Sequence, residues 1–145
     1  MKAIVKVKED AGAMEVKELP TPKPGPGEVL VKMKAAGLCY SDVMILKNTY
    51  KGRVPVPIPM IMGHEGAGVV AEVGEGVDHV KPGDKVGLNP LWGCNQCQNC
   101  LDGYPNMCMN WRHLGITCDG TFAEYRVVPA FVTYKLPESI SMIDA

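Results

Sequence analysis

Four cysteines lie close together in the second half of the sequence, and their spacing is the clearest sign of chemistry in the chain. Two residues separate Cys94 from Cys97 and Cys97 from Cys100, and Cys108 follows after seven more. Four thiolates at this spacing can bind one tetrahedral metal ion, with sulfur-to-metal distances of about 2.3 Å. A zinc ion bound by four thiolates has no position left for water or substrate. Such an ion would hold a loop in shape and take no part in a reaction.

Two other interpretations of these cysteines stay open. Cys-x-x-Cys pairs can form disulfides, but the N-terminal segment is charged and lacks the apolar run of a secretory signal, so we expect a cytoplasmic protein with reduced thiols. The same spacing opens iron–sulfur motifs, in which the fourth cysteine follows after three residues and precedes proline. Here Cys108 follows after seven residues and precedes Met109. Zinc therefore fits the spacing best.

The composition is typical of one domain rich in turns. The chain has 145 residues, the usual size of a single domain, and a net charge of −1, which leaves no basic surface for nucleic acid. Gly, Pro or a charge interrupts every apolar run well before the ~20 residues that a membrane span needs. We therefore expect neither nucleic acid nor a membrane as partner. The 16 glycines and 12 prolines favour short strands and frequent turns.

Alternating and β-branched runs predict the elements that must position these cysteines. Strands are predicted over residues 2–7, 14–19, 28–36, 67–73, 85–88, 120–128 and 131–134. A short helix is predicted over residues 41–46, with Ser41 or Asp42 as its N-cap, and another helix is predicted to begin at Pro137. Cys39 then lies at a strand-to-helix corner, where helix N–H groups favour a thiolate.

One glycine pattern imitates a nucleotide-binding motif. Residues 66–71 read Gly-Ala-Gly-Val-Val-Ala, close to the dinucleotide fingerprint. That fingerprint needs a strand before the glycines and a helix after them, whereas a proline-rich connector precedes this pattern and a strand follows it. We predict that it binds no nucleotide.

A lone cysteine and a lone histidine, such as Cys39 and His64, are a weak pair, because buried residues of both types are commoner than ligands. Their surroundings say more. In order along the chain stand Gly-Leu-Cys-Tyr-Ser-Asp at 37–42, Gly-His-Glu-Gly-Ala-Gly-Val-Val at 63–70, Val-Lys-Pro-Gly-Asp-Lys-Val at 80–86, the four-cysteine loop, and Gly-Thr-Phe-Ala-Glu-Tyr at 120–125.

These five motifs resemble the zinc-dependent alcohol dehydrogenases of the medium-chain dehydrogenase/reductase superfamily. The resemblance covers the whole chain and implies that residues 1–145 are the N-terminal catalytic domain of such an enzyme. The implied fold is mainly β: a GroES-like, partly open β-barrel with short helices and a four-cysteine structural zinc loop.

The resemblance also implies a second, catalytic zinc site. Cys39 and His64 would be two of its protein ligands, and Glu65 would lie beside the metal as an outer group or an exchangeable ligand. Asp42 would orient His64 through the second ring nitrogen, and Ser41 would accept the proton of the substrate.

Two parts of the family pattern differ or are missing. The family commonly has a histidine three residues after the serine to pass the proton on, and this chain has Met44 there. A third zinc ligand and a nicotinamide-binding Rossmann domain are expected after Ala145. We therefore expect weaker zinc binding at the catalytic site than at the four cysteines, and no turnover by this polypeptide alone.

The implied function is the oxidation of an alcohol by hydride transfer to NAD or NADP, with a small alcohol or carbonyl compound as substrate. The alternative is a stand-alone zinc-binding GroES-like module for assembly or binding, and a homo-oligomer is left open. Four apolar side chains are candidates for the wall of the cleft or for the core: Leu38, Tyr40, Leu91 and Trp92. His113 either flanks the cleft or has a structural role, which we favour.

Overall fold

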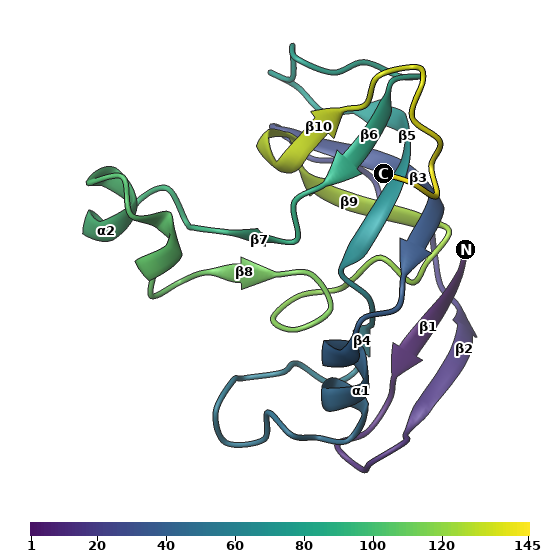
Figure 1. The fold of residues 1–145 in the computed structure, drawn as a ribbon, viewed down its shortest axis with the longest axis vertical. Coiled ribbons are helices and arrows are strands. Elements are labelled where there is room, and N and C mark those ends of the chain that lie inside the picture. The colour runs from purple at the N-terminus through teal and green to yellow at the C-terminus, as the bar shows by residue number, and fades with distance from the viewer.

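A computed structural model describes all of residues 1–145, and strands dominate it (Figure 1). The strands are β1 (Lys2–Lys6), β2 (Met14–Glu18), β3 (Glu28–Gly37), β4 (Met60–Ile61), β5 (Glu65–Val73), β6 (Lys85–Leu88), β7 (Leu91–Trp92), β8 (Arg112–His113), β9 (Tyr125–Pro129) and β10 (Thr133–Lys135). The helices are short: α1 (Tyr40–Leu46), α2 (Gln98–Leu101), and the 3-10 turns η1 (Pro105–Met107) and η2 (Ala130–Val132).

A curved five-stranded antiparallel sheet forms the body of the molecule, in the order β10-β6-β5-β3-β9. The two outer strands do not pair with each other, so the barrel is partly open. Valines on alternating strand positions fill its interior, because successive side chains of a strand point to opposite faces. Val29 and Val31 of β3, Val86 of β6 and Val128 of β9 are all 0% exposed. The expected mainly β barrel is confirmed.

A second, smaller sheet stands beside the barrel, with the order β2-β1-β4. The predicted hairpin is present, and β1 is its central strand. The N–H of Ile4 donates to the carbonyl of Phe122 at 2.8 Å, which ties this sheet to the segment before β9. Helix α1 lies next to the hairpin (Figure 1).

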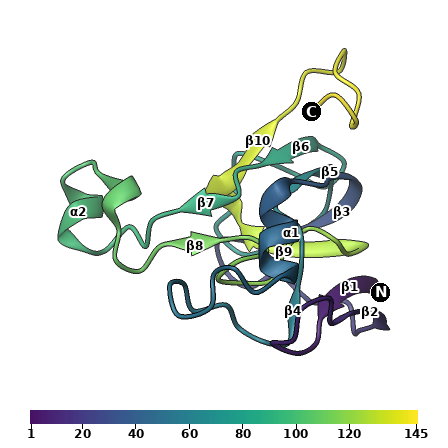
Figure 2. The same ribbon diagram turned by 60° about the horizontal axis from the view of Figure 1, so that its bottom comes forward.

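The four cysteines belong to a lobe that projects from the barrel. Strands β7 and β8 form its two-stranded stem, and α2 and η1 lie at its far end (Figures 1 and 2). Cys108 is the one buried residue between positions 94 and 112. The lobe therefore has no apolar core of its own.

Four sequence predictions of local structure were wrong. One is the strand over residues 131–134, because residues 131 and 132 belong to η2 and β10 begins only at Thr133. The N-cap of α1 is Cys39, since the side chain of Asp42 accepts a bond inside the first turn. Residues 120–122 are not a strand, because their N–H groups bond to the carbonyls of residues 61–63, and β9 begins only at Tyr125. The segment after Pro137 forms turns and no helix.

No helix in the structure has the length and apolar character that a membrane crossing requires.

Candidate metal centres

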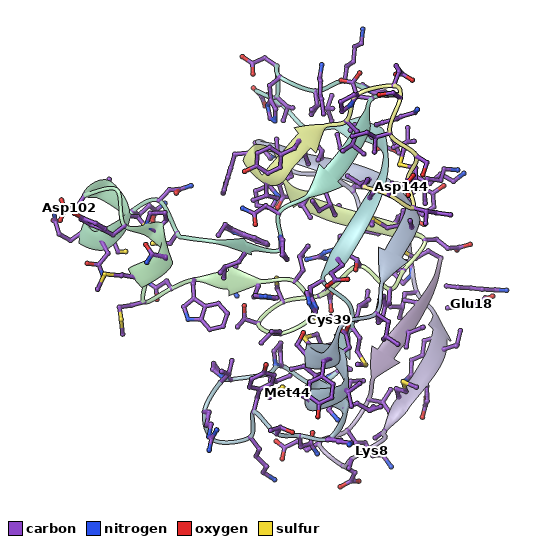
Figure 3. All side chains as sticks on the ribbon, viewed as in Figure 1. Lys8, Glu18, Cys39, Met44, Asp102 and Asp144 are labelled. Atoms are coloured by element: carbon purple, nitrogen blue, oxygen red, sulfur yellow. The ribbon has the colours of Figure 1, made fainter.

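The first turn of α1 fixes Cys39 where the helix meets the barrel (Figure 3). The backbone N–H of Cys39 donates to Asp42 Oδ2 at 2.9 Å, as in a capping box. Asp42 is only 2% exposed, so this bond is shielded from water. A buried carboxylate needs such partners, and its other oxygen faces His64.

Backbone packing behind His64 places its ring. Gly63, which precedes it, has φ of +88°, a conformation that favours glycine. Gly115 and Gly120 pack against the backbone of Gly63 so closely that a Cβ on either would overlap the Gly63 carbonyl. Three glycines thus meet at one point, and His64 follows directly from it with 7% exposure.

Five predicted residues come together at this corner. The donor atoms of Cys39, His64 and Glu65 lie within 4.8 Å of one another. His64 Nδ1 lies 3.5 Å from Asp42 Oδ1, and His64 Nε2 lies 3.1 Å from Ser41 Oγ. A thiolate, an imidazole and a carboxylate are the donor types that zinc prefers, and a carboxylate on the second ring nitrogen is the usual support of a ligand histidine. The residues present therefore fit a zinc ion.

His113, for which the sequence favoured a structural role, stands beside this corner. Its ring centroid is 5.2 Å from that of His64 and 6.3 Å from that of Trp111, and both ring pairs are edge to face. His113 Nδ1 lies 2.7 Å from the carbonyl of Leu114, so Nδ1–H is the donor. Burial lowers the pKa of His113 and favours the neutral ring. The pairing of β7 with β8 and the loop that follows bring it here, and no local sequence pattern reveals this pairing.

The other candidates for the cleft wall behave differently. Leu38 and Tyr40 are 77% and 72% exposed and belong to no core. Leu91 is also exposed, whereas Trp92 packs on the barrel core. Met44 of α1 (labelled in Figure 3) accepts a bond from the hydroxyl of Tyr50 at 3.8 Å. A thioether carries no proton, so Met44 cannot continue a relay from Ser41.

The four lobe cysteines form the second group. Their sulfurs all lie within 4.8 Å of one another, and no cysteine of the chain forms a disulfide. The Cys97 sulfur is 3.6 Å from that of Cys100 and 3.8 Å from that of Cys108. A tetrahedron with metal–sulfur bonds of about 2.3 Å has edges of about 3.8 Å. The cage therefore has the size of a zinc–thiolate site.

Backbone N–H groups prepare this cage for thiolates. The N–H of Cys97 donates to Cys94 Sγ at 3.3 Å, and that of Cys94 donates to Cys108 Sγ at 3.2 Å. Bonds from the backbone of Gln96 and Cys97 lower the pKa of Cys94 to about 6, whereas burial raises the pKa of Cys100 to about 12. One thiolate is thus available at neutral pH before any metal arrives.

The glycine pattern at residues 66–71 has a packing role. It lies inside the continuous strand β5, and no helix follows it. A Cβ on Gly66 would meet Met33 and Thr121, and one on Gly68 would overlap the backbone of Lys32. These glycines let β3 and β5 approach each other, and nothing in their surroundings resembles a phosphate cradle.

Comparison with known proteins agrees with this geometry. Residues 25–138 match the family described as the alcohol dehydrogenase GroES-like domain. L-threonine 3-dehydrogenase of Pyrococcus furiosus is 43% identical over 140 residues, which cover 97% of this chain and 40% of the relative.

Two solved structures are similar over nearly the whole chain. An NAD-dependent alcohol dehydrogenase superposes with a TM-score of 0.88 at 39% identity, covering 98% of this chain and 41% of that protein. A thermostable alcohol dehydrogenase from Pyrobaculum aerophilum with cobalt and zinc bound gives 0.85 at 35% identity, covering 99% and 43%. The chain thus spans about 40% of the length of these proteins.

Proposed function

Because this chain belongs to the family of alcohol dehydrogenase GroES-like domains, we propose that it is the catalytic zinc domain of an NAD- or NADP-dependent alcohol dehydrogenase. One observation carries the proposal: the donor atoms of Cys39, His64 and Glu65 meet within 4.8 Å of one another. Ser41 and Asp42 both contact the same histidine. This arrangement has the parts of a catalytic site, whereas the four-cysteine cage is closed to substrate.

Each residue at the corner has a task that follows from its position. Cys39 and His64 would hold the zinc ion, and Glu65 would lie beside it as an exchangeable ligand. A zinc ion bound there supplies a Lewis acid that makes an alcohol more acidic. Asp42 keeps the Nδ1–H of His64 in place, so that Nε2 is left unprotonated as the ligand atom.

Ser41 is the proposed proton acceptor for the substrate. Its hydroxyl is 3.1 Å from His64 Nε2, so an alcohol held at the metal would lie within reach of it. Hydride transfer to NAD or NADP needs a nicotinamide site, for which we assign no residue of this chain. The substrate class is a small alcohol or the corresponding carbonyl compound.

Metal titration of the 145-residue chain tests the proposal. Cobalt replaces zinc and gives visible d–d bands and thiolate charge-transfer bands at each site. We expect two cobalt ions per chain, one lost in His64→Ala and the other lost in Cys97→Ala. A single ion in the native chain, unaffected by His64→Ala, would contradict the catalytic site.

Activity is the second test, made in a polypeptide that joins this chain to a nicotinamide-binding domain. NAD- or NADP-dependent alcohol oxidation that is lost in His64→Ala supports the proposal. Two bound metals without any such oxidation would instead indicate a zinc-binding assembly module.

The proposal includes a reducing compartment, the cytoplasm, as the place of action. The six cysteines without disulfides support it, because such thiols persist where glutathione and thioredoxin keep them reduced. A homo-oligomer is also compatible with the exposed side chains of Leu101, Tyr104, Met107 and Met109 on the lobe, which light scattering on the purified protein would test.

A further inference from the structure

Lys6, on β1, is a charged residue buried outside the metal centres. It is 1% exposed, and burial lowers the pKa of its ammonium group. No carboxylate lies within ion-pair distance of it: Glu9 is paired with Lys51 at 2.9 Å, and the negative charges of Asp10 and Glu9 oppose the effect of burial only from a longer distance. A buried cation without a partner carboxylate is unfavourable, so its hydrogen bonds indicate what it is for.

Those bonds run to the C-terminal end of α1. Lys6 Nζ donates to the carbonyl of Leu46 at 3.4 Å and to that of Asp10, in the hairpin turn, at 3.1 Å. The N–H of Gly12, in the same turn, also donates to the Leu46 carbonyl, at 3.0 Å. The hairpin therefore binds the last residue of the helix with a cation and an amide.

The helix leaves this carbonyl without any other partner. Asn48, with φ of 58°, begins a Schellman motif: its N–H bonds to Ile45, and the N–H of Thr49 bonds to Met44. Leu46 is the helical residue whose carbonyl this motif does not use. Helix α1 has no basic residue in its last turn. Lys6 therefore supplies the positive charge that a helix C-terminus favours.

Apolar packing holds α1 only weakly. Two of its seven residues are buried, and one of these is Asp42 itself. Ile45 is thus the one buried apolar residue of the helix and packs with Met60, Met62 and Ile116, while the half-buried Leu46 packs against the same cluster. A helix of seven residues is about 10 Å long, so a shift at its C-terminal end also moves its N-terminal end.

We infer that Lys6 is a positioning residue for the catalytic metal site, acting through α1. The ammonium holds the C-terminal end of the helix, and Cys39, Ser41 and Asp42 stand at the other end. This inference rests on the proposed function, because it concerns the metal site proposed there. The hairpin β1–β2 contacts no ligand, yet through Lys6 it orients the helix that carries the ligand residue.

Cobalt titration of Lys6→Met tests the inference, since methionine keeps an unbranched side chain of similar size and removes the donors. We expect about tenfold weaker cobalt binding at the Cys39–His64 site, the scale seen when outer partners of ligands are lost, and altered d–d bands. The four-cysteine site serves as the internal control and keeps its affinity. Lys6→Arg, which retains donors and has an adjoining cavity of about 200 Å³ to occupy, should restore much of the loss.

Val128→Ala controls for a general loss of stability. Val128 is 0% exposed in the barrel core, on β9, and touches neither α1 nor the hairpin. It should lower the melting temperature without changing the cobalt spectrum. If Lys6→Met lowers the melting temperature but leaves cobalt binding and spectrum as in Val128→Ala, the inference is wrong. If the native chain itself binds no cobalt at Cys39 and His64, the proposed function is wrong. This result is distinct from a native chain that binds cobalt there and a Lys6→Met variant that binds it equally well.

Discussion

At the scale of single residues, Asp42 links the two ligands of the candidate catalytic site. One carboxylate oxygen accepts the N–H of Cys39 at 2.9 Å, and the other faces His64 Nδ1 at 3.5 Å. The N–H of Cys39 is a donor, and Nδ1 of His64 is one in the tautomer that the proposed function requires, so a group that only accepts hydrogen bonds suits the position. An amide of the same shape would place an NH₂ group against one of these donors.

We therefore predict that Asp42→Asn weakens metal binding at this site about 10- to 100-fold, the usual effect of losing the partner of a ligand histidine. Cobalt titration followed by its visible spectrum measures the change. Asp78→Asn is the matched control, because the Asp78 side chain is 98% exposed. Equal affinities in the two variants would show that Asp42 does not support the ligand.

Ser41 gives a second prediction at this scale. If its hydroxyl accepts the substrate proton, Ser41→Ala should lower kcat by about 10²–10⁴-fold, the range of general acid–base contributions. Metal binding should stay intact, because Ser41 is not a ligand in the proposal. Steady-state kinetics in the polypeptide with the nicotinamide domain, together with cobalt titration, separate the two effects. Unchanged kcat would contradict the assignment.

Cys94 shows how the backbone prepares a ligand. Its pKa is lowered to about 6 mainly by the N–H groups of Gln96 and Cys97, so above pH 6 the metal-free thiol is largely ionised. We predict that iodoacetamide at pH 7 alkylates Cys94 before Cys100, whose pKa is raised to about 12. Peptide mass spectrometry measures the order, and bound zinc should block both reactions. Faster labelling of Cys100 would contradict the prediction.

At the scale of elements, glycines decide how closely segments approach. Gly63, Gly115 and Gly120 form one contact point directly before His64. A methyl group on Gly120 would overlap the carbonyl of Gly63, and the backbone would have to move. Gly87 in β6 offers a contrast, because a Cβ there would meet only Leu136 at an ordinary 3.5 Å.

Gly120→Ala should therefore destabilise the protein by about 1–3 kcal/mol, as overpacking does, and weaken metal binding at His64. Gly87→Ala should stay within about 0.5 kcal/mol of the native protein, the range of unremarkable substitutions. Urea denaturation gives the free energies of unfolding. Similar values for the two variants would show that the contact point does not constrain the fold.

The same elements show what the sequence could predict. The hairpin, β3 and β6 follow from alternating or β-branched residues, which are local signals. The N-cap of α1 was misjudged, because the cap depends on the Asp42 side chain reaching back to Cys39. The place of His113 beside His64 could not be predicted, because it depends on the pairing of β7 with β8 and on the loop that follows.

At the scale of the whole molecule, the barrel and the lobe are stabilised in different ways. The barrel has a closed core of valines and leucines and can fold by burying apolar surface. Between positions 94 and 112 the lobe has Cys108 as its one buried residue, and Leu101, Tyr104, Met107 and Met109 are exposed. Apart from local hydrogen bonds, such as that of Asn99 Nδ2 to the Met107 carbonyl at 2.7 Å, the two-stranded stem and the four sulfurs hold it together, and an isolated two-stranded ribbon is marginal in water.

The lobe should therefore depend on its metal, while the barrel should not. Small zinc sites provide about 10–16 kcal/mol of apparent binding free energy, which here would be folding free energy of the lobe. After complete removal of zinc with a strong chelator, we predict that amides 94–112 exchange hydrogen like an unfolded chain, whereas those of β3 and β5 stay protected. Hydrogen exchange with mass spectrometry measures both regions, and Cys97→Ala should reproduce the result without chelator. Lobe amides that stay protected in the metal-free protein would show that contacts other than the four sulfurs hold it.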